Sequence, residues 1–170
     1  MIILMAGLPG TGKTTLARAL VQRTQGALIS KDEIRAAIFS PEDLEYSTDQ
    51  DDFVMEVMLD AARFLLRENP ARHVFLDGRT FSRGYQIERV FEVAAELGQS
   101  CRILECVCSD ESARRRLDLE PDPSHPAHNR TFALYQKVKA RFEPIVRDKT
   151  TISTDEPLDL SLKKALLAIA

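Results

Sequence analysis

The feature that most constrains this chain is residues 7–14, which read GLPGTGKT and match the spacing G-x-x-x-x-G-K-T. A continuous apolar run at 2–6 precedes the segment, and Leu16, Ala19 and Leu20 recur after it at helical spacing. A glycine-rich loop between a strand and a helix is the context in which this motif cradles phosphate. The sequence therefore predicts a phosphate-binding loop, and a glycine-rich turn that matches by chance is the weaker interpretation.

The requirements of a bound triphosphate explain the residue types of the loop. Its three glycines let successive backbone N–H groups turn toward an oxyanion with no Cβ in the way. The helix that begins near Lys13 directs the positive end of its dipole at the phosphates. Lys13 supplies a cation to the β and γ oxygens, and the Thr14 hydroxyl suits Mg²⁺. The residues expected to bind ATP are Gly7, Leu8, Pro9, Gly10, Thr11, Gly12, Lys13, Thr14 and Thr15.

Segments typical of strands and helices alternate along the whole chain. Short apolar runs predict five strands, at 2–6, 27–30, 73–76, 101–107 and 150–153. Helices are expected at 13–24, 32–39, about 53–69, 85–97, 110–119, 131–142 and 158–168. This alternation implies an α/β fold in which helices cover both faces of a parallel sheet and ligands bind at the carboxyl ends of the strands. We expect a single domain over residues 1–170.

Composition disfavours several classes of protein. The 170 residues carry a formal net charge of −3, whereas a general nucleic-acid coat needs a basic surface. The apolar start of the chain is too short to span a bilayer and lacks the basic region that precedes a signal-peptide core. We therefore expect a cytoplasmic protein with no membrane partner. Cys101, Cys106 and Cys108 lack the spacing of a metal site and are expected to be buried, reduced thiols.

Asp32 directly follows the second predicted strand, at the edge of the sheet where the phosphate loop is expected. A carboxylate at this position could accept the proton of an attacking hydroxyl. Arg35 lies one helical turn later, so it would share a face with Asp32 and could hold the substrate or the carboxylate. The alternative is an ordinary helix start, in which Ser30 caps the helix and the acidic residues complement its dipole. The two interpretations are compatible.

Asp77 ends the third predicted strand and is a candidate ligand for Mg²⁺ in addition to Thr14. The position also suits substrate orientation, or a simple turn formed with a following glycine. Of the arginines that follow, Arg79 is nearest the expected cleft. Arg83 and Arg89 are expected to be solvated residues or ion-pair partners.

Three segments resemble a family of small P-loop kinases: the glycine loop, residues 31–35 (KDEIR) and residues 75–81 (FLDGRTF). The family includes the kinase domain of phage polynucleotide kinase, chloramphenicol phosphotransferase and zeta toxins. The resemblance implies a three-layer α/β/α P-loop NTPase fold, a five-stranded parallel sheet in the order 2-3-1-4-5, and a lid at about 118–130. In those relatives an aspartate after strand two is the general base, and an arginine three residues later engages substrate or phosphate. Asp32 and Arg35 match these two positions.

Arginines near the expected lid are candidates for stabilising the charge that develops during phosphoryl transfer. Three consecutive arginines, at 114–116, point about 100° apart on a helix and cannot all reach one phosphate. The resemblance favours Arg116 and Arg130 as catalytic residues, together with Lys13. The departures from the family pattern are the acidic residues Asp118, Glu120 and Asp122. Because of these acidic residues, the sequence leaves open which catalytic role belongs to Arg116 and which to Arg130.

Six carboxylates lie between residues 41 and 52: Glu42, Asp43, Glu45, Asp49, Asp51 and Asp52. Such a cluster would repel a polynucleotide and favour a neutral or cationic hydroxylated molecule, although a solvated acidic surface is the simpler explanation. We therefore expect transfer of the γ-phosphate of Mg²⁺-bound ATP to a hydroxyl of a small molecule. The alternatives are a polynucleotide 5′-hydroxyl kinase and a regulatory nucleotide-binding ATPase without an acceptor. A nucleoside monophosphate kinase would need a more arginine-rich acceptor site.

Overall fold

The computed structural model describes residues 1–119 and 130–170 and contains one five-stranded parallel sheet in the order β2-β3-β1-β4-β5. The strands are β1 Ile2–Ala6, β2 Ala27–Ser30, β3 Val74–Asp77, β4 Cys101–Val107 and β5 Thr150–Ser153. The predicted α/β fold and the predicted strand order are both confirmed. In this order β1 is the central strand, and the phosphate loop leaves its carboxyl end.

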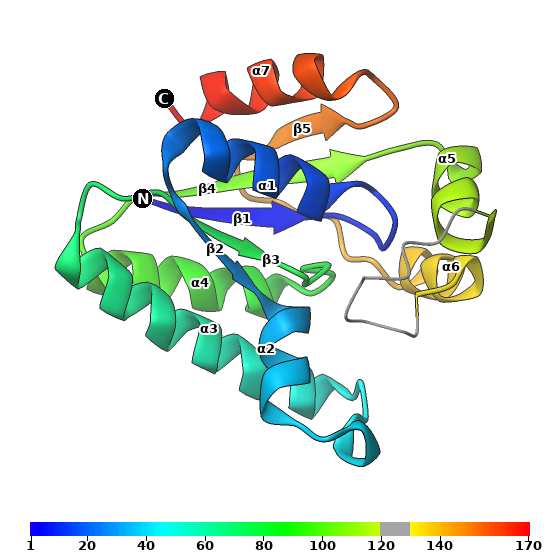
Figure 1. Cartoon of the computed structure of the whole chain (residues 1–170), viewed down its shortest axis with the longest axis horizontal. Helices are drawn as coiled ribbons and strands as arrows, with labels where there is room; N and C mark the ends of the chain where they lie inside the picture. The colour runs from blue at the N-terminus through cyan, green and yellow to red at the C-terminus, as the bar shows by residue number, and fades with distance from the viewer. Residues whose placement is uncertain (120–129) are drawn as a thin grey trace.

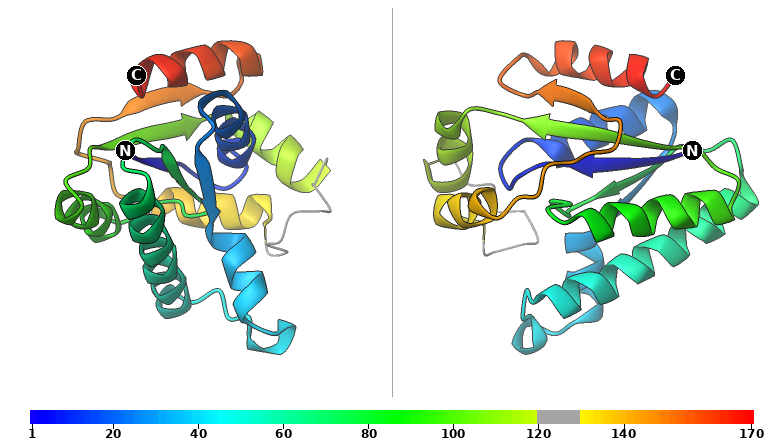
Figure 2. Two further views of the ribbon diagram at one scale, coloured as in Figure 1. Left: turned by 60° about the vertical axis from the view of Figure 1, so that its left-hand side comes forward. Right: turned by 180° about the vertical axis from the view of Figure 1, so that it is seen from behind.

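The described helices cover both faces of the sheet (Figure 1). They are α1 Lys13–Thr24, α2 Lys31–Ile38, α3 Thr48–Glu68, α4 Gly84–Glu96, α5 Asp110–Arg114, α6 Phe132–Ala140 and α7 Leu158–Ala168. Helices α1 and α7 lie on one face, and α3 and α4 lie on the other, as the view from behind also shows (Figure 2). Helix α2 follows the carboxyl end of β2, while α5 and α6 lie beyond the end of β4. These three helices therefore surround the edge of the sheet at which ligands are expected.

The central strand β1 shows why the sheet is read so easily from sequence. All five of its residues are fully buried. Ile3 and Met5 pack with α1 and α7, whereas Ile2, Leu4 and Ala6 pack with α3 and α4. A strand covered on both faces needs apolar side chains at every position, and the continuous apolar run at 2–6 records that requirement.

The structure differs from the sequence prediction at the ends of several helices. Helix α3 begins at Thr48, about five residues earlier than predicted, because the Ser47 hydroxyl accepts a hydrogen bond from the Gln50 N–H and caps the helix. The helix predicted over 110–119 is α-helical only to Arg114 and continues as a π-helical turn over Arg115–Leu119. Most of the lid predicted at about 118–130, together with Glu120 and Asp122, lies outside the described residues.

Helix α6 is fastened beside α5 by three polar contacts. The Asp118 Oδ1 atom accepts a hydrogen bond from the Phe132 N–H at 2.9 Å. The Asp110 Oδ1 atom accepts from the Tyr135 hydroxyl and from Lys139 Nζ, both at 2.6 Å. These contacts set the position of α6 opposite the phosphate loop.

The cysteines are free thiols, as predicted, but of the three only Cys106 is buried in the core, and Cys101 and Cys108 are partly exposed. Burial raises the pKa of the Cys106 thiol to about 12, because the thiolate would lose its hydration. Over the described part of the chain, no helix combines the length and apolarity needed to cross a membrane.

Candidate active site

The loop over residues 7–12 has a backbone that only glycine adopts without strain at three positions. Gly7, Gly10 and Gly12 have φ angles of 130°, 75° and 77°. A Cβ atom on Gly7 would lie 2.3 Å from the Cys106 carbonyl oxygen, which belongs to the neighbouring strand β4. The loop therefore fits against β4 only because the side chain is absent.

Lys13 is folded back over the loop that precedes it. Its Nζ atom donates to the Gly7 carbonyl at 2.8 Å and to the Leu8 carbonyl at 2.7 Å. Burial lowers the pKa of the Lys13 ammonium group, and the Asp77 carboxylate partly opposes that shift. The ammonium group is thus held inside the ring of loop backbone, where an incoming phosphate would meet it.

Thr14 and Asp77 link the loop to strand β3. The Thr14 hydroxyl donates to Asp77 Oδ2 at 2.7 Å. Asp77 is only 1% exposed, and its Oδ1 atom is buried without a hydrogen-bond partner among the described residues. A hydroxyl and an orphaned carboxylate oxygen suit a hard cation such as Mg²⁺, so the two residues predicted as its ligands fit the ion. Within 1–119 and 130–170, no cluster of three or more His, Cys, Asp or Glu side chains forms a separate metal site.

Asp32 lies in a buried network of charges at the start of α2. Ser30 caps the helix, with its hydroxyl accepting from the Glu33 N–H at 3.4 Å, as the alternative interpretation expected. Asp32 Oδ1 lies 3.7 Å from Arg35 Nη1 and 4.0 Å from Lys31 Nζ. The Asp51 carboxylate pairs with both of these cations, at 2.9 Å from Lys31 and in contact with Arg35. Two cations therefore position the Asp32 carboxylate.

Gly78 lets the end of β3 approach the start of α2. Its φ angle is 91°, and a Cβ atom there would lie 3.0 Å from the Lys31 Cβ atom. Because β2 and β3 are paired with Ser30 opposite Asp77, this close approach sets Asp77 and Asp32 at the same edge of the sheet. The glycine in the turn after Asp77 therefore also allows the end of β3 to pack closely against the start of α2.

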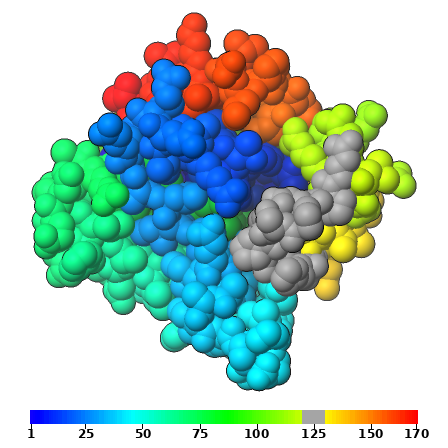
Figure 3. All heavy atoms as spheres, in the orientation of Figure 1, coloured from blue at the N-terminus to red at the C-terminus, as the bar shows by residue number. Residues whose placement is uncertain are grey.

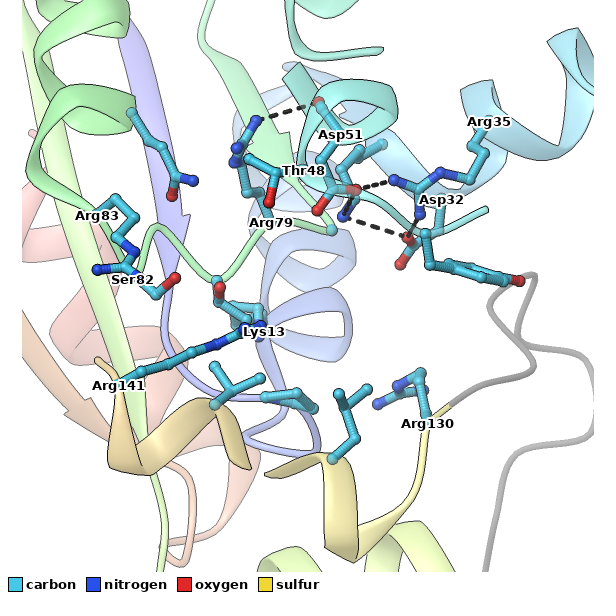
Figure 4. Close-up of a pocket in the computed structure, with 18 of the residues that line it drawn as sticks. Lys13, Asp32, Arg35, Thr48, Asp51, Arg79, Ser82, Arg83, Arg130 and Arg141 are labelled. Atoms are coloured by element: carbon cyan, nitrogen blue, oxygen red, sulfur yellow. Dashed lines mark hydrogen bonds and ion pairs between the residues drawn. The ribbon is translucent and has the colours of Figure 1, made fainter. Parts of the chain in front are cut away.

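A cavity of about 350 Å³ lies over this edge of the sheet. The lining residues are Pro9, Lys13, Thr14, Lys31, Asp32, Arg35, Tyr46, Thr48, Asp51, Gly78, Arg79, Thr80, Ser82, Arg83, Tyr85, Gln86, Arg130, Leu134, Val138 and Arg141. Figure 4 shows Asp32, Arg35 and Asp51 grouped at one side, Arg83 at the other, and Lys13 between them. Arg130 comes from the side of α6, and the Arg141 side chain runs toward Lys13. In the space-filling view, α2 and the segment after it form a lobe beside the phosphate-loop region (Figure 3).

Most of the predicted site residues meet in or beside this cavity, but Arg116 does not line it. The Arg116 guanidinium donates to the Gly10 carbonyl at 3.2 Å, to Thr154 Oγ1 at 3.0 Å and to the Thr154 carbonyl at 2.7 Å. The structure thus separates it from Arg130 and ties it to the back of the loop. Among the residues predicted to bind ATP, Leu8 packs against Ala113, Leu117 and Tyr135, and Thr15 is exposed.

The lining also includes polar residues that the sequence did not single out for the site, among them Lys31, Gln86, Arg141 and Thr48. The first lies beside Asp32 and could have been suspected from its position. The other three come from α3, α4 and the end of α6, and no local pattern marks them. Arg83, expected to be a solvated residue or an ion-pair partner, pairs with Glu143 at 2.8 Å and also lines the cavity.

Two residues of the acidic segment have a role that the sequence did not predict. Asp51 pairs with Lys31 and Arg35, and Asp52 contacts Arg79, so these two carboxylates neutralise cations of the site. The other four carboxylates of the segment are exposed, as the simpler explanation of a solvated acidic surface expected. The cavity itself is lined by more arginines than carboxylates.

Comparison with known proteins identifies the family and the fold. A family model described as AAA domain matches residues 2–145. No curated protein matches the chain. Kti12 of Chaetomium thermophilum in complex with ADP-AlF3 aligns over 100% of both chains, with 17% identity and a TM-score of 0.71.

Two kinase structures are also similar to this chain. The APS kinase CysC of Mycobacterium tuberculosis, in complex with AMPPNP and APS, aligns over 99% of this chain and 96% of that chain, with 17% identity and a TM-score of 0.69. A gluconokinase of Sinorhizobium meliloti 1021 aligns over 99% and 90%, with 15% identity and a TM-score of 0.67. These likenesses establish a fold that small P-loop kinases share.

Proposed function

Because this chain belongs to the AAA domain family, we propose that it is a P-loop kinase that transfers the γ-phosphate of ATP to a hydroxyl of a small molecule. One observation carries the proposal: Asp32 faces the same cavity as Lys13 and Thr14. A protein that only binds nucleotide needs no carboxylate in the cavity of its phosphate loop, whereas a kinase needs one to accept the proton of the acceptor hydroxyl. The whole chain, 1–170, would act as one domain.

In the proposed reaction the acceptor hydroxyl attacks the γ-phosphorus. A bond forms from the hydroxyl oxygen to the γ-phosphorus, and the bond from the γ-phosphorus to the β,γ-bridging oxygen breaks, releasing ADP. The hydroxyl proton passes to the Asp32 carboxylate, which acts as general base. Lys31 and Arg35, at 4.0 Å and 3.7 Å from Asp32 Oδ1, orient that carboxylate toward the acceptor.

Two cations, Lys13 and Arg130, would stabilise the transferred group. Lys13 contacts the β and γ oxygens, exchanging its bonds to the Gly7 and Leu8 carbonyls for bonds to phosphate. Arg130, which lines the cavity from the side of α6, would contact the γ-phosphate together with Lys13. Their charge is directed at oxygens on which negative charge accumulates during transfer. Arg116, tied to Gly10 and Thr154, would serve the nucleotide side of the loop rather than the acceptor.

Thr14 and Asp77 would hold Mg²⁺, through the hydroxyl and the orphaned Oδ1 atom. When bound, the ion neutralises charge on the β- and γ-phosphates. The neighbouring folds support a kinase, since solved structures of an APS kinase and a gluconokinase align over nearly the whole chain.

A polynucleotide 5′-hydroxyl kinase is the second candidate, because the arginines of the cavity would also suit a phosphodiester backbone. It uses the same general base, so the two candidates differ only in the acceptor. A regulatory ATPase without an acceptor would yield inorganic phosphate alone.

A transfer assay with γ-labelled ATP tests the proposal. The panel should contain sugars, sugar acids, sugar phosphates, nucleosides, hydroxylated antibiotics and 5′-hydroxyl oligonucleotides, with Lys13→Ala protein as the blank. We expect label in an organic product of at least one small molecule. Label only in inorganic phosphate would contradict the proposal, and label only in the oligonucleotide would favour the second candidate.

A further inference from the structure

The cavity has a large excess of positive charge. Seven cationic side chains line it, namely Lys13, Lys31, Arg35, Arg79, Arg83, Arg130 and Arg141. Only two carboxylates, Asp32 and Asp51, line it with them. When the flanking Asp52, Asp77 and Glu143 are also counted, the cations outnumber the carboxylates by two. The donor phosphates account for Arg130, and the Asp77 carboxylate acts on Lys13. The charge of Arg141 therefore remains to be explained by the acceptor side.

The positive charge around the general base is already compensated. Asp51 pairs with Lys31 at 2.9 Å and contacts Arg35, and both cations also lie within 4.0 Å of Asp32. These groups form a nearly neutral network at one side of the cavity. An acceptor hydroxyl that approaches Asp32 therefore meets polar groups that have partners.

The positive charge on the other side of the cavity is not compensated by carboxylates in this way. Figure 4 places Arg83 away from Asp32, on the far side of Lys13, and shows the Arg141 side chain running from that side toward Lys13. Arg83 pairs with Glu143, but that carboxylate is half-exposed and also accepts from the Gly84 N–H at 2.8 Å. Within the described ranges, the Arg141 side chain has no ion-pair or hydrogen-bond partner. The two guanidinium groups that line this side of the cavity are therefore a half-exposed ion-pair partner and a cation without a partner among the described residues.

Buried polar atoms without partners lie in the same region. Gln86 is 7% exposed, and its Oε1 atom accepts no hydrogen bond from the described residues. Arg79 is 3% exposed, and its Nε atom is likewise unpartnered. A buried acceptor that lines a cavity suits a ligand hydroxyl, and a buried guanidinium N–H suits a ligand oxygen, because such groups rarely remain unpaired.

We propose that the acceptor is a small hydroxylated anion, whose carboxylate, phosphate or sulfate group is bound by Arg83 and Arg141. A further hydroxyl of the same molecule donates to Gln86 Oε1, and the reacting hydroxyl faces Asp32. This inference rests on the proposed kinase function and narrows its substrate class. A volume of about 350 Å³ is at the low end of the roughly 300–1,000 Å³ typical of small-molecule sites, which favours a compact acceptor.

Binding of matched probes tests this inference without relying on catalysis. Isothermal titration calorimetry would use protein saturated with Mg²⁺ and a non-hydrolysable ATP analogue, so that the donor site is filled. One series is glucose, glucosamine, gluconate and glucose 6-phosphate, and a shorter one is glycerol, glycerate and glycerol 3-phosphate. We expect at least one carboxylate or phosphate to bind ten-fold or more tightly than its neutral counterpart, and the carboxylate and phosphate arms distinguish the two anions.

Arginine variants then test whether Arg83 and Arg141 bind the anionic group. Arg83→Gln and Arg141→Gln should each weaken the preferred anion about ten-fold while leaving a neutral probe unchanged. Arg89→Gln is the matched control, because Arg89 lies on α4 but pairs with Glu56 and Glu92 outside the cavity. Glu143→Gln should keep or increase affinity for the anion, since it removes the carboxylate that competes for Arg83.

The outcomes separate the two proposals. Equal or tighter binding of the neutral or ammonium probes, no binding of any anion, or anion affinity unaffected by both arginine variants would overturn the anionic acceptor. The transfer assay reports on kinase function independently. Selective anion binding without phosphorylation of any hydroxyl would keep the anion site and reject the kinase, whereas phosphorylation with no preference for anions would do the reverse.

Discussion

The Thr14 hydroxyl donates to Asp77 Oδ2 at 2.7 Å, across the space between the phosphate loop and the end of strand β3. The two residues are 63 positions apart in the sequence, yet each depends on the other. The hydroxyl is the partner of a carboxylate that is only 1% exposed, and the carboxylate in turn orients the hydroxyl. The pairing of β1 with β3 makes this contact possible.

Replacement of the Thr14 hydroxyl should therefore affect both folding and metal use. Thr14→Val leaves the buried Asp77 carboxylate without this hydrogen bond, which should lower the free energy of unfolding by about 1–3 kcal/mol. It should also raise the Mg²⁺ concentration required for ATP binding. Urea unfolding and Mg²⁺ titrations of nucleotide affinity measure the two effects. Thr14→Ser keeps the hydroxyl and is the control; equal losses in both variants would contradict this account.

Asp32→Asn tests the general base. The amide cannot accept the proton, so phosphoryl transfer should slow by about 100- to 10,000-fold. The affinity for ATP should change by less than about three-fold, because Asp32 is expected to contact the acceptor and not ATP. Initial rates and fluorescent-nucleotide binding give the two numbers. Asp60→Asn, at an exposed carboxylate paired with Arg63 on α3, should leave the rate unchanged. Normal turnover by Asp32→Asn protein would remove Asp32 as the base.

Gly7→Ala tests the packing of the phosphate loop. The new Cβ atom would lie 2.3 Å from the Cys106 carbonyl oxygen, at a residue whose φ angle is 130°. We expect the free energy of unfolding to fall by about 3 kcal/mol or more, since neither backbone can yield. Gly98→Ala, where φ is 62° and no atom lies within 4 Å, should lose only about 1 kcal/mol. Similar losses at the two positions, measured by chemical unfolding, would show that the close approach to β4 is unimportant.

The burial of Lys31 predicts a pH dependence of stability. Burial lowers the pKa of its ammonium group from 10.5 to about 8, although Asp32 partly opposes the shift. Between these values the unfolded chain binds more protons than the folded chain, so stability rises as the pH rises. From pH 8 to pH 10 the native protein should gain about 2 kcal/mol relative to Lys31→Met protein. Unfolding curves for both proteins across this range provide the measurement, and parallel pH profiles would contradict the prediction.

The strands were predictable because a strand that is buried on both faces carries apolar side chains at successive positions. Strand β1 is apolar at all five positions, and β4 and β5 lie within the boundaries expected from their apolar runs. Helix ends were less predictable, because they depend on single capping contacts. Ser47 starts α3 before the acidic residues that look like a loop, and nothing in the apolar period signals it.

The acidic residues at the start of α3 show what sequence alone could not supply. Asp51 and Arg35 belong to different helices, and only the packing of α3 beside α2 brings their charges together. A count of carboxylates in one segment could not show which of them stay in solvent and which, like Asp51 and Asp52, pair with cations of the cavity. Arg141 was missed for the same reason, since its role depends on where α6 ends.

The two ends of the cavity come from different stretches of the chain, which bears on how such a protein can evolve. Residues 7–14 and the Arg116–Thr154 contact behind them build the end that faces nucleotide. Asp32, Arg79, Arg83 and Gln86, from α2, the turn after β3 and the start of α4, build the other. Polar contacts that join the two parts include Thr14 with Asp77 and the Gly7 N–H with the Thr80 carbonyl. Substitutions in the second set of residues can therefore change which acceptor fits the cavity while they leave the phosphate loop and its supporting contacts in place.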